Sequence, residues 1–532
     1  MIVNKKLQVW LPLLFSIVLV IGMVLGYKLN SDRGNKGSFF SAGRGSALQQ
    51  ALDLIRLKYV DSVNTDSLGG QAIQDMMNQL DPHSVYFPPA ELQTANEDLQ
   101  GIFEGIGVEF NIFGDTVNVV YVIPGGPSEK EGLQIGDRIV KVNDEVIAGK
   151  NLDADAIRKR IRGESGSKVT VGVLRNNQAK SFTITRGNIP VLSVDAAYMI
   201  DKTTGYIKLT KFTEKSYEEF MRAMEDLQKQ GLQNLVFDLR GNGGGFMNEA
   251  VDMADEFLDG DKLIVYTEGV NSHKQEYRCK RPGIFEKGKL FILVDELTAS
   301  ASEVLAGALQ DWCRATIVGR RTFGKGLVQE QFPLDGGGAI RLTIARYYTP
   351  MGRSIQRSYE KGKKIYMDEL WDRYSHGDLI SADSNKASNG KVYLTVCKDT
   401  VYGGGGIMPS LFVPLDTSTT QQRLNHIYNT NGLNNATYNY YLQHQAEINA
   451  YKTATDYNQQ FNRGADIWQE LLKESGDSLN PNALSDTEKE SIQLRLKALL
   501  ARYRWRNSGY FQVLNSNDGV VKKVMSLVNG SK

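Results

Sequence analysis

Residues 290–303 read LFILVDELTASASE, an apolar run that leads through a polar turn into small residues. The run Leu290–Val294 predicts a buried strand, and apolar residues at helical spacing predict a helix over Ser300–Trp312. A serine at a strand-to-helix turn lies beside free backbone N–H groups, where the helix dipole favours negative charge. Ser300 is therefore a candidate nucleophile, although a helix N-cap is the commoner role of serine at this place.

Strands and helices alternate on both sides of this stretch, between residues 191 and 349. Strands are expected at Gly205–Leu209, Asn234–Leu239, Thr316–Val318, Leu327–Phe332 and Ala339–Tyr348, and helices at Ser216–Gln230 and Asn248–Leu258. Because apolar strands alternate with helices, the pattern predicts a layered α/β core.

Lys325 stands between two glycines in the sequence TFGKG, residues 322–326. Glycines allow the backbone to approach another element closely. The apolar neighbours Phe323, Leu327 and Val328 could desolvate the ammonium group, so that the lysine loses its proton and serves a serine as general base. Taken alone, Lys325 could equally be a solvated lysine in a turn.

A glycine-rich turn follows the strand expected at Asn234–Leu239, in the sequence FDLRGNGGG, residues 237–245. Consecutive glycines after a buried strand form a nest of exposed N–H donors, which can hold a tetrahedral oxyanion. A flexible turn is the alternative. A phosphate-binding loop is excluded, because the sequence here fits neither GxGxxG nor GxxxxGK[ST].

The chain has 532 residues with 62 basic and 61 acidic side chains, so no basic field favours nucleic acid as a partner. Its length predicts several domains. The sequence has no zinc-type spacing of Cys and His, so no metal or other cofactor is expected. The three cysteines, Cys279, Cys313 and Cys397, cannot all pair and are expected to be small buried apolar residues.

The N-terminus carries an apolar run from Leu7 to Tyr27, preceded by Lys5 and Lys6. About 20 apolar residues suffice to cross a bilayer, whereas the apolar part of a cleaved signal peptide spans roughly 7–15. We expect residues 1–27 to form a cytoplasmic tip and an uncleaved transmembrane anchor, followed by a linker at 28–45. A cleaved signal peptide is the alternative.

The remaining segments differ in character. Residues 46–100 carry apolar residues at helical spacing up to Asp81-Pro82, which predicts an N-terminal helical segment. Residues 101–187 read as short strands around a helix at Asp153–Arg162, with the size of a small autonomous domain. The core is expected over 188–360, and a partly helical C-terminal extension over 361–532, with helices at Ala465–Glu474 and Asp486–Arg504.

Five strings occur in the order and spacing of the carboxy-terminal processing peptidases, or tail-specific proteases: DLRGNGGG, TASASE, LQDW, FGKGLVQ and ARYYTPMGRSIQ. The chain resembles this family over roughly residues 46–415. Each string is weak alone, whereas five in order are specific. The resemblance implies a mixed α/β (α+β) fold with a layered crotonase/ClpP-like protease core and a Ser–Lys dyad.

The resemblance also implies roles for individual residues. Ser300, rather than Ser302, matches the nucleophile, and Lys325 matches the general base. The other implied site residues are Gln329, which orients the lysine; Asp311, an acidic residue sometimes grouped with the dyad but three helical turns from Ser300; and the oxyanion donors Ala301 and Gly244. The family usually has Pro where Gly243 stands, which puts the geometry of the nest in doubt.

The β-rich segment 101–187 resembles a PDZ domain, with the hallmark GLQIGDRI at residues 132–139. Its string GIGV matches the carboxylate-binding loop, which implies peptide binding by Gly105, Ile106, Gly107 and Val108. Free N–H groups of such a loop bind a terminal carboxylate while the peptide adds a strand to the sheet edge.

The expected function is a serine endopeptidase that captures free, apolar protein C-termini and cleaves near them. A catalytically inactive peptide-binding scaffold is the alternative, and an unrelated hydrolase with the same layered core is a third interpretation. Family members with one N-terminal anchor imply an inner-membrane protein whose catalytic region faces the periplasm. The helical C-terminal region could support a homodimer.

Overall fold

A computed structural model describes residues 47–381, 390–476 and 479–530, together with Ser16, Val18–Val20 and Met23. The expected anchor and linker therefore lie almost entirely outside the described residues. Among the helices that are described, none combines the length and hydropathy needed to cross a membrane. The chain divides into two units, residues 1–73 and 74–532, and the smaller one contains α2 (Ala47–Lys58) and the start of α3 (Thr65–Leu80).

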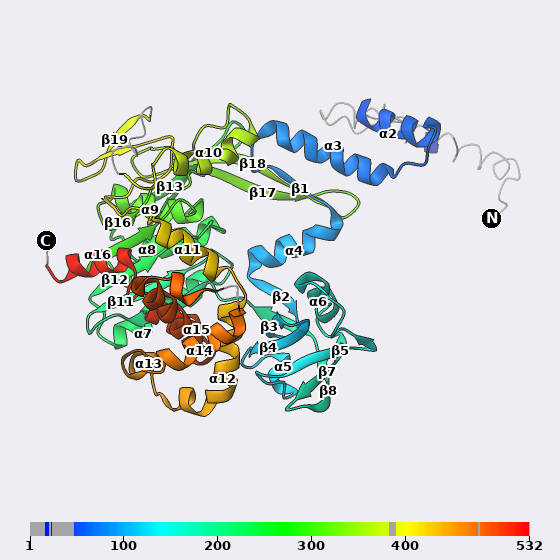
Figure 1. Ribbon diagram of the computed structural model, residues 1–532. Helices are drawn as coiled ribbons and strands as arrows, with labels where there is room; N and C mark the ends of the chain where they lie inside the picture. The colour runs from blue at the N-terminus through cyan, green and yellow to red at the C-terminus, as the bar shows by residue number, and fades with distance from the viewer. Residues whose placement is uncertain are drawn as a thin grey trace, which may run out of the picture. The chain divides into compact units, whose positions relative to one another are not determined.

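A six-stranded sheet forms the centre of the larger unit (Figure 1). Its strands run in the order β10 (Val194–Met199), β11 (Thr204–Leu209), β12 (Asn234–Asp238), β15 (Lys289–Val294), β16 (Thr316–Gly319) and β21 (Leu411–Phe412). All neighbours pair in parallel except β10 with β11. Parallel strands are covered on both faces, which explains why these segments read as continuous apolar runs.

Alternate residues of this sheet enter two different cores. Leu235 and Phe237 of β12 pack with helices α7 (Ser216–Lys229), α8 (Met247–Asp255) and α9 (Ala301–Asp311). Val236 points to the other face, where α16 (Gly519–Val528) supplies Val520, Val521 and Val524. The core thus extends beyond residue 360, because both β21 and α16 come from the C-terminal segment.

A second sheet, in which all described strand pairs are antiparallel, carries the hairpin of β17 (Leu327–Pro333) and β18 (Ala339–Tyr348). Strand β18 also pairs with β1 (Val85–Phe87) and β13 (Leu263–Glu268), and β13 pairs with β14 (Gln275–Arg278). The segment 81–87 is therefore held against the protease core by backbone pairing. Helix α4 (Pro89–Gln100) follows it.

The segment 101–187 forms a small domain of its own. Strands β2 (Ile102–Gly105) and β9 (Gly187–Pro190) pair antiparallel where the chain enters and leaves it. Between them, β3 (Val108–Phe113), β4 (Thr116–Val122), β5 (Arg138–Val142), β7 (Lys168–Arg175) and β8 (Gln178–Thr185) form a sheet, to which β6 (Glu145–Val146) adds. Helices α5 (Pro127–Lys130) and α6 (Ala154–Ile161) complete the domain, and its buried residues form a separate apolar core.

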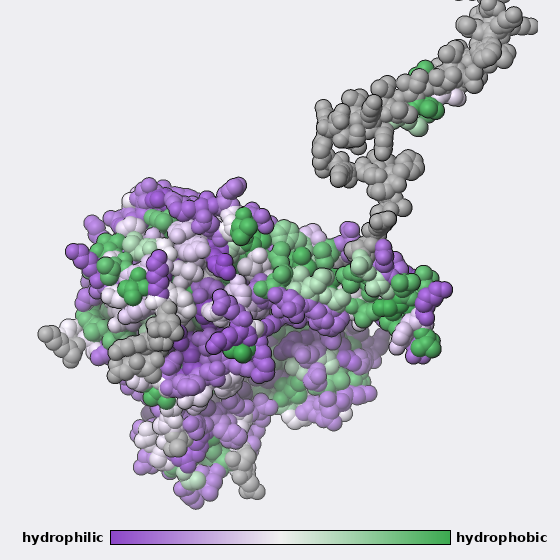
Figure 2. Space-filling view, turned by 90° about the horizontal axis from the view of Figure 1, so that it is seen from above, coloured by the Kyte–Doolittle hydropathy of each residue, from purple (hydrophilic) through white to green (hydrophobic). Residues whose placement is uncertain are grey.

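The C-terminal region is more helical than its sequence pattern indicates. It contains α10 (Lys363–Ser375), α11 (Thr419–Tyr428), α12 (Gly432–Ala450), α13 (Ala454–Gln460), α14 (Gly464–Ser475) and α15 (Asp486–Leu514), with a short hairpin of β19 (Val392–Leu394) and β20 (Thr400–Tyr402). Helices α11–α15 share an apolar core that includes Tyr457, Leu496 and Leu500. Polar residues cover most of the visible face of the larger unit, and apolar side chains gather only in smaller patches (Figure 2).

The expectation that all three cysteines are unpaired apolar residues is wrong for two of them. Cys313, just after α9, forms a disulfide with Cys397, just after β19, and only Cys279 is a free buried cysteine. The two partners are 84 residues apart, so the local sequence around either cysteine does not predict the pairing. The disulfide ties the β19–β20 hairpin to the C-terminal end of α9.

Candidate active site

Ser300 lies at the turn between β15 and α9, as the sequence predicts, and is the N-cap residue of the helix. Its φ of 59° is a positive value that residues other than glycine rarely adopt, at a cost of about 1–3 kcal/mol. Gly244 of the glycine nest packs directly against it, because a Cβ added at Gly244 would lie 2.7 Å from the Cβ of Ser300. A side chain at position 244 would therefore displace the nucleophile.

Lys325 lies just before β17 and is held by the side chain of Gln329, which is on that strand. Its Nζ donates to Gln329 Oε1 at 2.9 Å, and Gln329 Nε2 donates to the carbonyl oxygen of His83 at 2.5 Å. Burial, assisted by the nearby charge of Arg341, lowers the pKa of Lys325 to about 8. At pH 7 roughly a tenth of this lysine is thus neutral and able to accept a proton, against less than one part in a thousand at the ordinary pKa of lysine.

The backbones of Ser300 and Lys325 are joined through the buried side chain of Glu303. Glu303 Oε2 accepts from the N–H of Ser300 at 2.8 Å and from the N–H of Lys325 at 2.9 Å, while Oε1 accepts from the N–H of Gly324 and the hydroxyl of Thr322. Burial raises the pKa of Glu303 to about 7, although the four hydrogen bonds oppose this shift.

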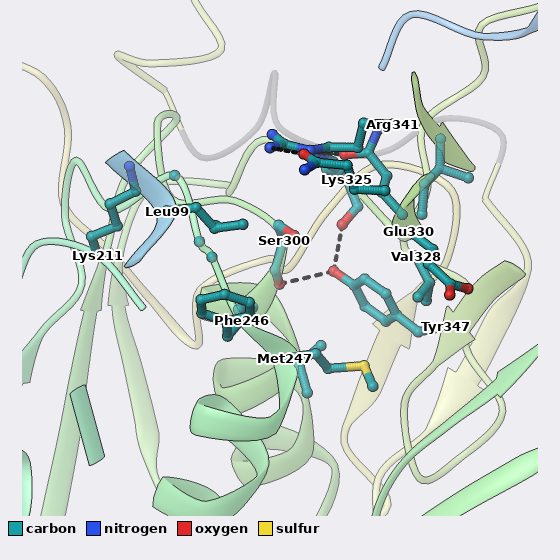
Figure 3. A pocket seen from close by; sticks show the side chains of 18 of the residues that line it. Leu99, Lys211, Phe246, Met247, Ser300, Lys325, Val328, Glu330, Arg341 and Tyr347 are labelled. Carbon is teal, nitrogen blue, oxygen red and sulfur yellow. Dashed lines mark hydrogen bonds between the residues drawn. The ribbon is translucent and has the colours of Figure 1, made fainter. Parts of the chain in front are cut away.

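Tyr347 of β18 makes a second bridge between the same two residues. Its hydroxyl lies between the carbonyl oxygen of Ser300, at 3.0 Å, and that of Lys325, and can donate to either (Figure 3). Tyr347 is buried, and its ring closes the pocket below the two catalytic candidates. Nucleophile and base are therefore positioned by contacts to their backbones.

Ser300 and Lys325 both line one pocket of about 730 Å³. Its wall beside Ser300 is largely apolar and includes Phe246, Met247, Val304, Leu327 and Val328. Among the described residues, the hydroxyl of Ser300 makes no hydrogen bond to Nζ of Lys325. The two groups share a cavity, and a substrate carbonyl entering it would meet both.

The glycine nest contributes to this pocket, but one predicted donor is engaged elsewhere. The N–H of Gly244 donates to Oδ1 of Asn242 at 2.9 Å, so in this conformation it is not free for an oxyanion. Within the described residues, the N–H groups of Ala301, Gly243 and Gly245 have no acceptor. Ala301 thus remains available as predicted, and the nest offers its other glycines.

Asp311 lies far from the pocket, at the opposite end of α9 from Ser300. The eleven residues of this helix span about 16 Å. Arg353 donates to Asp311 Oδ1 at 2.7 Å, and both side chains are completely buried. The structure therefore groups Asp311 with a buried ion pair and not with the dyad. Ser302 is also buried, and its hydroxyl donates to the carbonyl of Asn242 at 3.0 Å.

The predicted carboxylate loop, Gly105–Val108, lies in the small domain and lines a separate cavity of about 360 Å³ between β3 and α6. Gly107 has a φ of +77°, which favours glycine. Among the described residues, no acceptor pairs with the N–H groups of Ile106 and Gly107. The loop can therefore donate to an anion.

Three residues of the site are missing from the expectations drawn from the sequence. Glu303 had a signal, because Ser-x-x-Glu at a helix start is a capping box, but its contacts to residues 322–325 are long-range. Tyr347 and His83 had none, since only the fold brings β18 and segment 81–87 to Lys325. No group of three metal-ligating side chains occurs in the part of the chain that is described.

Comparison with known proteins assigns this chain to a family. Residues 203–362 match the model of peptidase family S41, residues 105–185 that of the PDZ domain, and residues 423–506 that of a family of unknown function. The chain is 31% identical over 388 residues to the carboxy-terminal processing protease CtpA of Bacillus subtilis, covering 72% of this chain and 82% of that one. The chain belongs to the carboxy-terminal processing protease family.

Two further similarities accompany this assignment to the carboxy-terminal processing proteases. A probable CtpA-like serine protease of Staphylococcus saprophyticus is 32% identical over 397 residues, which cover 72% of this chain and 77% of that protein. Among solved structures, the photosystem II D1 C-terminal processing protease is 30% identical over 58% of this chain and 83% of its own, with a TM-score of 0.35.

As a carboxy-terminal processing protease, the chain is a serine endopeptidase with a PDZ domain that binds peptides. The expected mixed α/β fold with an inserted PDZ domain and helical terminal regions is confirmed. The alternatives of an inactive scaffold and of an unrelated hydrolase are not favoured.

Proposed function

We propose that Ser300 attacks the scissile carbonyl while Lys325 accepts its proton. The Oγ–C bond forms as the proton moves to Nζ, and the peptide C–N bond then breaks as Lys325 gives that proton to the leaving amine. Lys325 then takes a proton from water as the water oxygen attacks the acyl carbon; the Oγ–C bond breaks, that proton passes to Oγ of Ser300, and the acid product leaves. The lowered pKa of Lys325, in the pocket that also holds Ser300, is the observation that carries this proposal.

Stabilisation of the oxyanion is assigned to the N–H of Ala301 together with a donor of the glycine nest. Gly244 joins them only after releasing Asn242, whereas Gly243 and Gly245 need no such change. Preorganised donors of this kind are typically worth about 3–4 kcal/mol each in the transition state. The apolar wall formed by Met247, Val304 and Leu327 suits an apolar side chain beside the cleaved bond.

The substrates are proteins with free, apolar C-termini, captured by the loop Gly105–Val108. Support comes from the free N–H groups of this loop and from the cavity that it lines. Capture in the PDZ domain would leave the preceding chain free to reach Ser300. Cleavage would therefore fall near the substrate's C-terminus.

The compartment and assembly belong to the same proposal. We assign residues 1–27 to a single-pass inner-membrane anchor with the catalytic region in the periplasm, a cleaved signal peptide being the alternative. The Cys313–Cys397 disulfide supports an oxidising compartment. A homodimer through the C-terminal helices would appear as twice the chain mass in light scattering.

The test uses the full chain with a disordered protein substrate that ends in apolar residues. Cleavage is expected to disappear in both Ser300→Ala and Lys325→Ala. It should persist in Ser302→Ala and in Lys361→Ala, which removes an exposed lysine. Cleavage that survives in Ser300→Ala would refute this assignment of the nucleophile.

A further inference from the structure

The C-terminal helix α15 reaches the peptide groove of the PDZ domain. Glu109 of β3 accepts a hydrogen bond from Arg502 Nη2 at 3.1 Å and others from Arg506. The guanidinium of Arg506 also lies 3.4 Å above the ring of Tyr121 on β4. Burial would raise the pKa of Glu109, but the two guanidiniums lower it below its ordinary value, so this carboxylate stays ionised.

Contacts away from Glu109 hold the same two parts together. The ring of Tyr438 of α12 lies 5.1 Å from that of Phe113 of β3, tilted by 47°, and the Tyr438 hydroxyl donates to the carbonyl of Val119 at 3.4 Å. Ile135 of the PDZ domain packs against the apolar core of helices α11–α15. The position of α15 beside the groove therefore does not depend on the arginines alone.

The groove itself carries an excess of positive charge. Its cavity is lined by the loop Gly105–Val108, by Arg158 of α6 and Arg162 just after that helix, and by Arg502, with Glu109 as the one acidic residue among them. Arg158 pairs with Asp155, and Arg162 pairs with Glu97 and lies over the ring of Phe103. An anion entering the groove would therefore meet free loop N–H groups and a net cationic wall.

Arg502 is the groove arginine whose guanidinium is fixed at two of its nitrogens, whereas Arg158 and Arg162 each donate to a single carboxylate. Its Nε donates to Asn507 and its Nη2 to Glu109, whereas Nη1 has no partner within the described part of the chain. Arg506 also donates to Glu109. The Glu109 carboxylate therefore keeps a partner if Arg502 also binds a ligand. A guanidinium fixed on one side presents its remaining N–H groups in the planar geometry that a carboxylate prefers.

We propose that Arg502 completes the binding site for the substrate's C-terminal carboxylate, together with the loop Gly105–Val108. The inference rests on the proposed function, which places peptide C-termini in this groove. It gives a role to the helical region 423–506, which matches a family of unknown function and contains both arginines. Substrate recognition is then shared by two domains.

The test measures binding without cleavage, in the full chain carrying Ser300→Ala. Two fluorescent peptides with the same apolar C-terminal sequence are compared by anisotropy, one ending in a carboxylate and the other in an amide. The chain should prefer the carboxylate form by about tenfold or more, the equivalent of one charge-assisted contact. Adding Arg502→Ala should remove most of that preference while leaving the affinity for the amide unchanged.

A matched control comes from the same helix. Arg504 donates to the carbonyl of Tyr451 and to Asn449, outside the groove, so Arg504→Ala should keep the full carboxylate preference. Arg502→Lys keeps the charge without the planar fork and should fall between Arg502→Ala and the parent chain. Its behaviour remains informative if the alanine variant does not fold.

The outcomes separate this inference from the one on which it rests. If the chain with Arg502 intact binds the acid and amide peptides equally, the proposed capture of C-termini fails. If it prefers the acid and Arg502→Ala keeps that preference, Arg502 has no part in recognition, while the proposed function stands. An equal loss for both peptides would make Arg502 a structural residue and would also overturn the inference.

Discussion

The backbones of Ser300 and Lys325 are bridged twice, once through their N–H groups and once through their carbonyl oxygens, and among the described residues no hydrogen bond joins their side chains. The Glu303 carboxylate accepts from the N–H of each residue, and the Tyr347 hydroxyl lies between their carbonyl oxygens. The separation of nucleophile and base is thus set by two buried side chains. The side chain of Lys325 is positioned separately, by its hydrogen bond to Gln329.

Replacing Glu303 by Gln is expected to reduce kcat by about 100-fold, the usual scale for misplacing a reacting group by about 1 Å. An amide offers one oxygen, so its nitrogen would face two of the donors that the carboxylate now accepts. The measurement is single-turnover cleavage, with KM followed separately. Unchanged kcat would show that Glu303 does not position the dyad.

The same variant carries a stability signature whose sign follows from the pKa. Burial raises the pKa of Glu303 to about 7, so the folded state binds a proton that the unfolded state releases above pH 4–5. The stability linked to this proton is fully present below that range and is lost as pH rises through about 7. Urea unfolding of Glu303→Gln between pH 5 and 8 should lack this decline.

Tyr347→Phe removes only the hydroxyl between the two carbonyls. A net hydrogen bond is worth about 1 kcal/mol, so a modest loss of stability and roughly a tenfold loss of kcat are expected. Tyr348→Phe is the matched control, because Tyr348 stacks on Tyr266 away from the pocket. Equal kinetics for the two variants would contradict a role for the Tyr347 bridge.

Local sequence signals predicted the elements that carry the dyad. The apolar run of β15 is continuous and the apolar residues of α9 recur at helical spacing, so Ser300 could be placed at the turn between them. The expected strands at 205–209, 234–239 and 339–348 correspond to β11, β12 and β18. Lys325 followed from its glycines and apolar neighbours.

What could not be predicted depends on contacts between distant segments. Strand β21 has two residues, and only its pairing with β16 makes it part of the sheet. Helix α16 is amphipathic, but nothing in its own sequence specifies the face of the sheet that it covers. The Cys313–Cys397 disulfide likewise joins segments that are 84 residues apart.

The pH dependence of cleavage should report Lys325. With a pKa of about 8, kcat/KM is expected to rise about tenfold per unit below that pH and to level off above it, because the base must be neutral. Arg341→Met removes a like charge, raises the pKa of Lys325 and shifts the profile to higher pH. Arg346→Met, on the same strand but bonded to Tyr359, should leave the midpoint in place. A profile unchanged by Arg341→Met would contradict this origin of the shift.

Gln329→Glu should move the same profile further. A carboxylate 2.9 Å from Nζ favours the ammonium form, so the pKa of Lys325 rises and cleavage at pH 7 falls, with recovery at higher pH. Gln329→Ala also frees Lys325 but adds no charge, so its loss of kcat should not recover with pH. Parallel pH–rate curves for the two variants would show that Gln329 acts by position alone.

Asp311→Asn distinguishes a structural acid from a catalytic one. Asp311 and Arg353 are both fully buried, so removing the carboxylate charge leaves a guanidinium unpaired in the core. Loss of one partner of such a pair lowers the free energy of unfolding by about 3–5 kcal/mol, so the midpoint temperature of thermal unfolding should fall. Because the pair lies about 16 Å along α9 from Ser300, kcat/KM per folded molecule should stay within about threefold of the parent. Asp335→Asn, in an exposed turn, serves as the control for stability. If Asp311→Asn is fully folded but inactive, Asp311 has a role in catalysis.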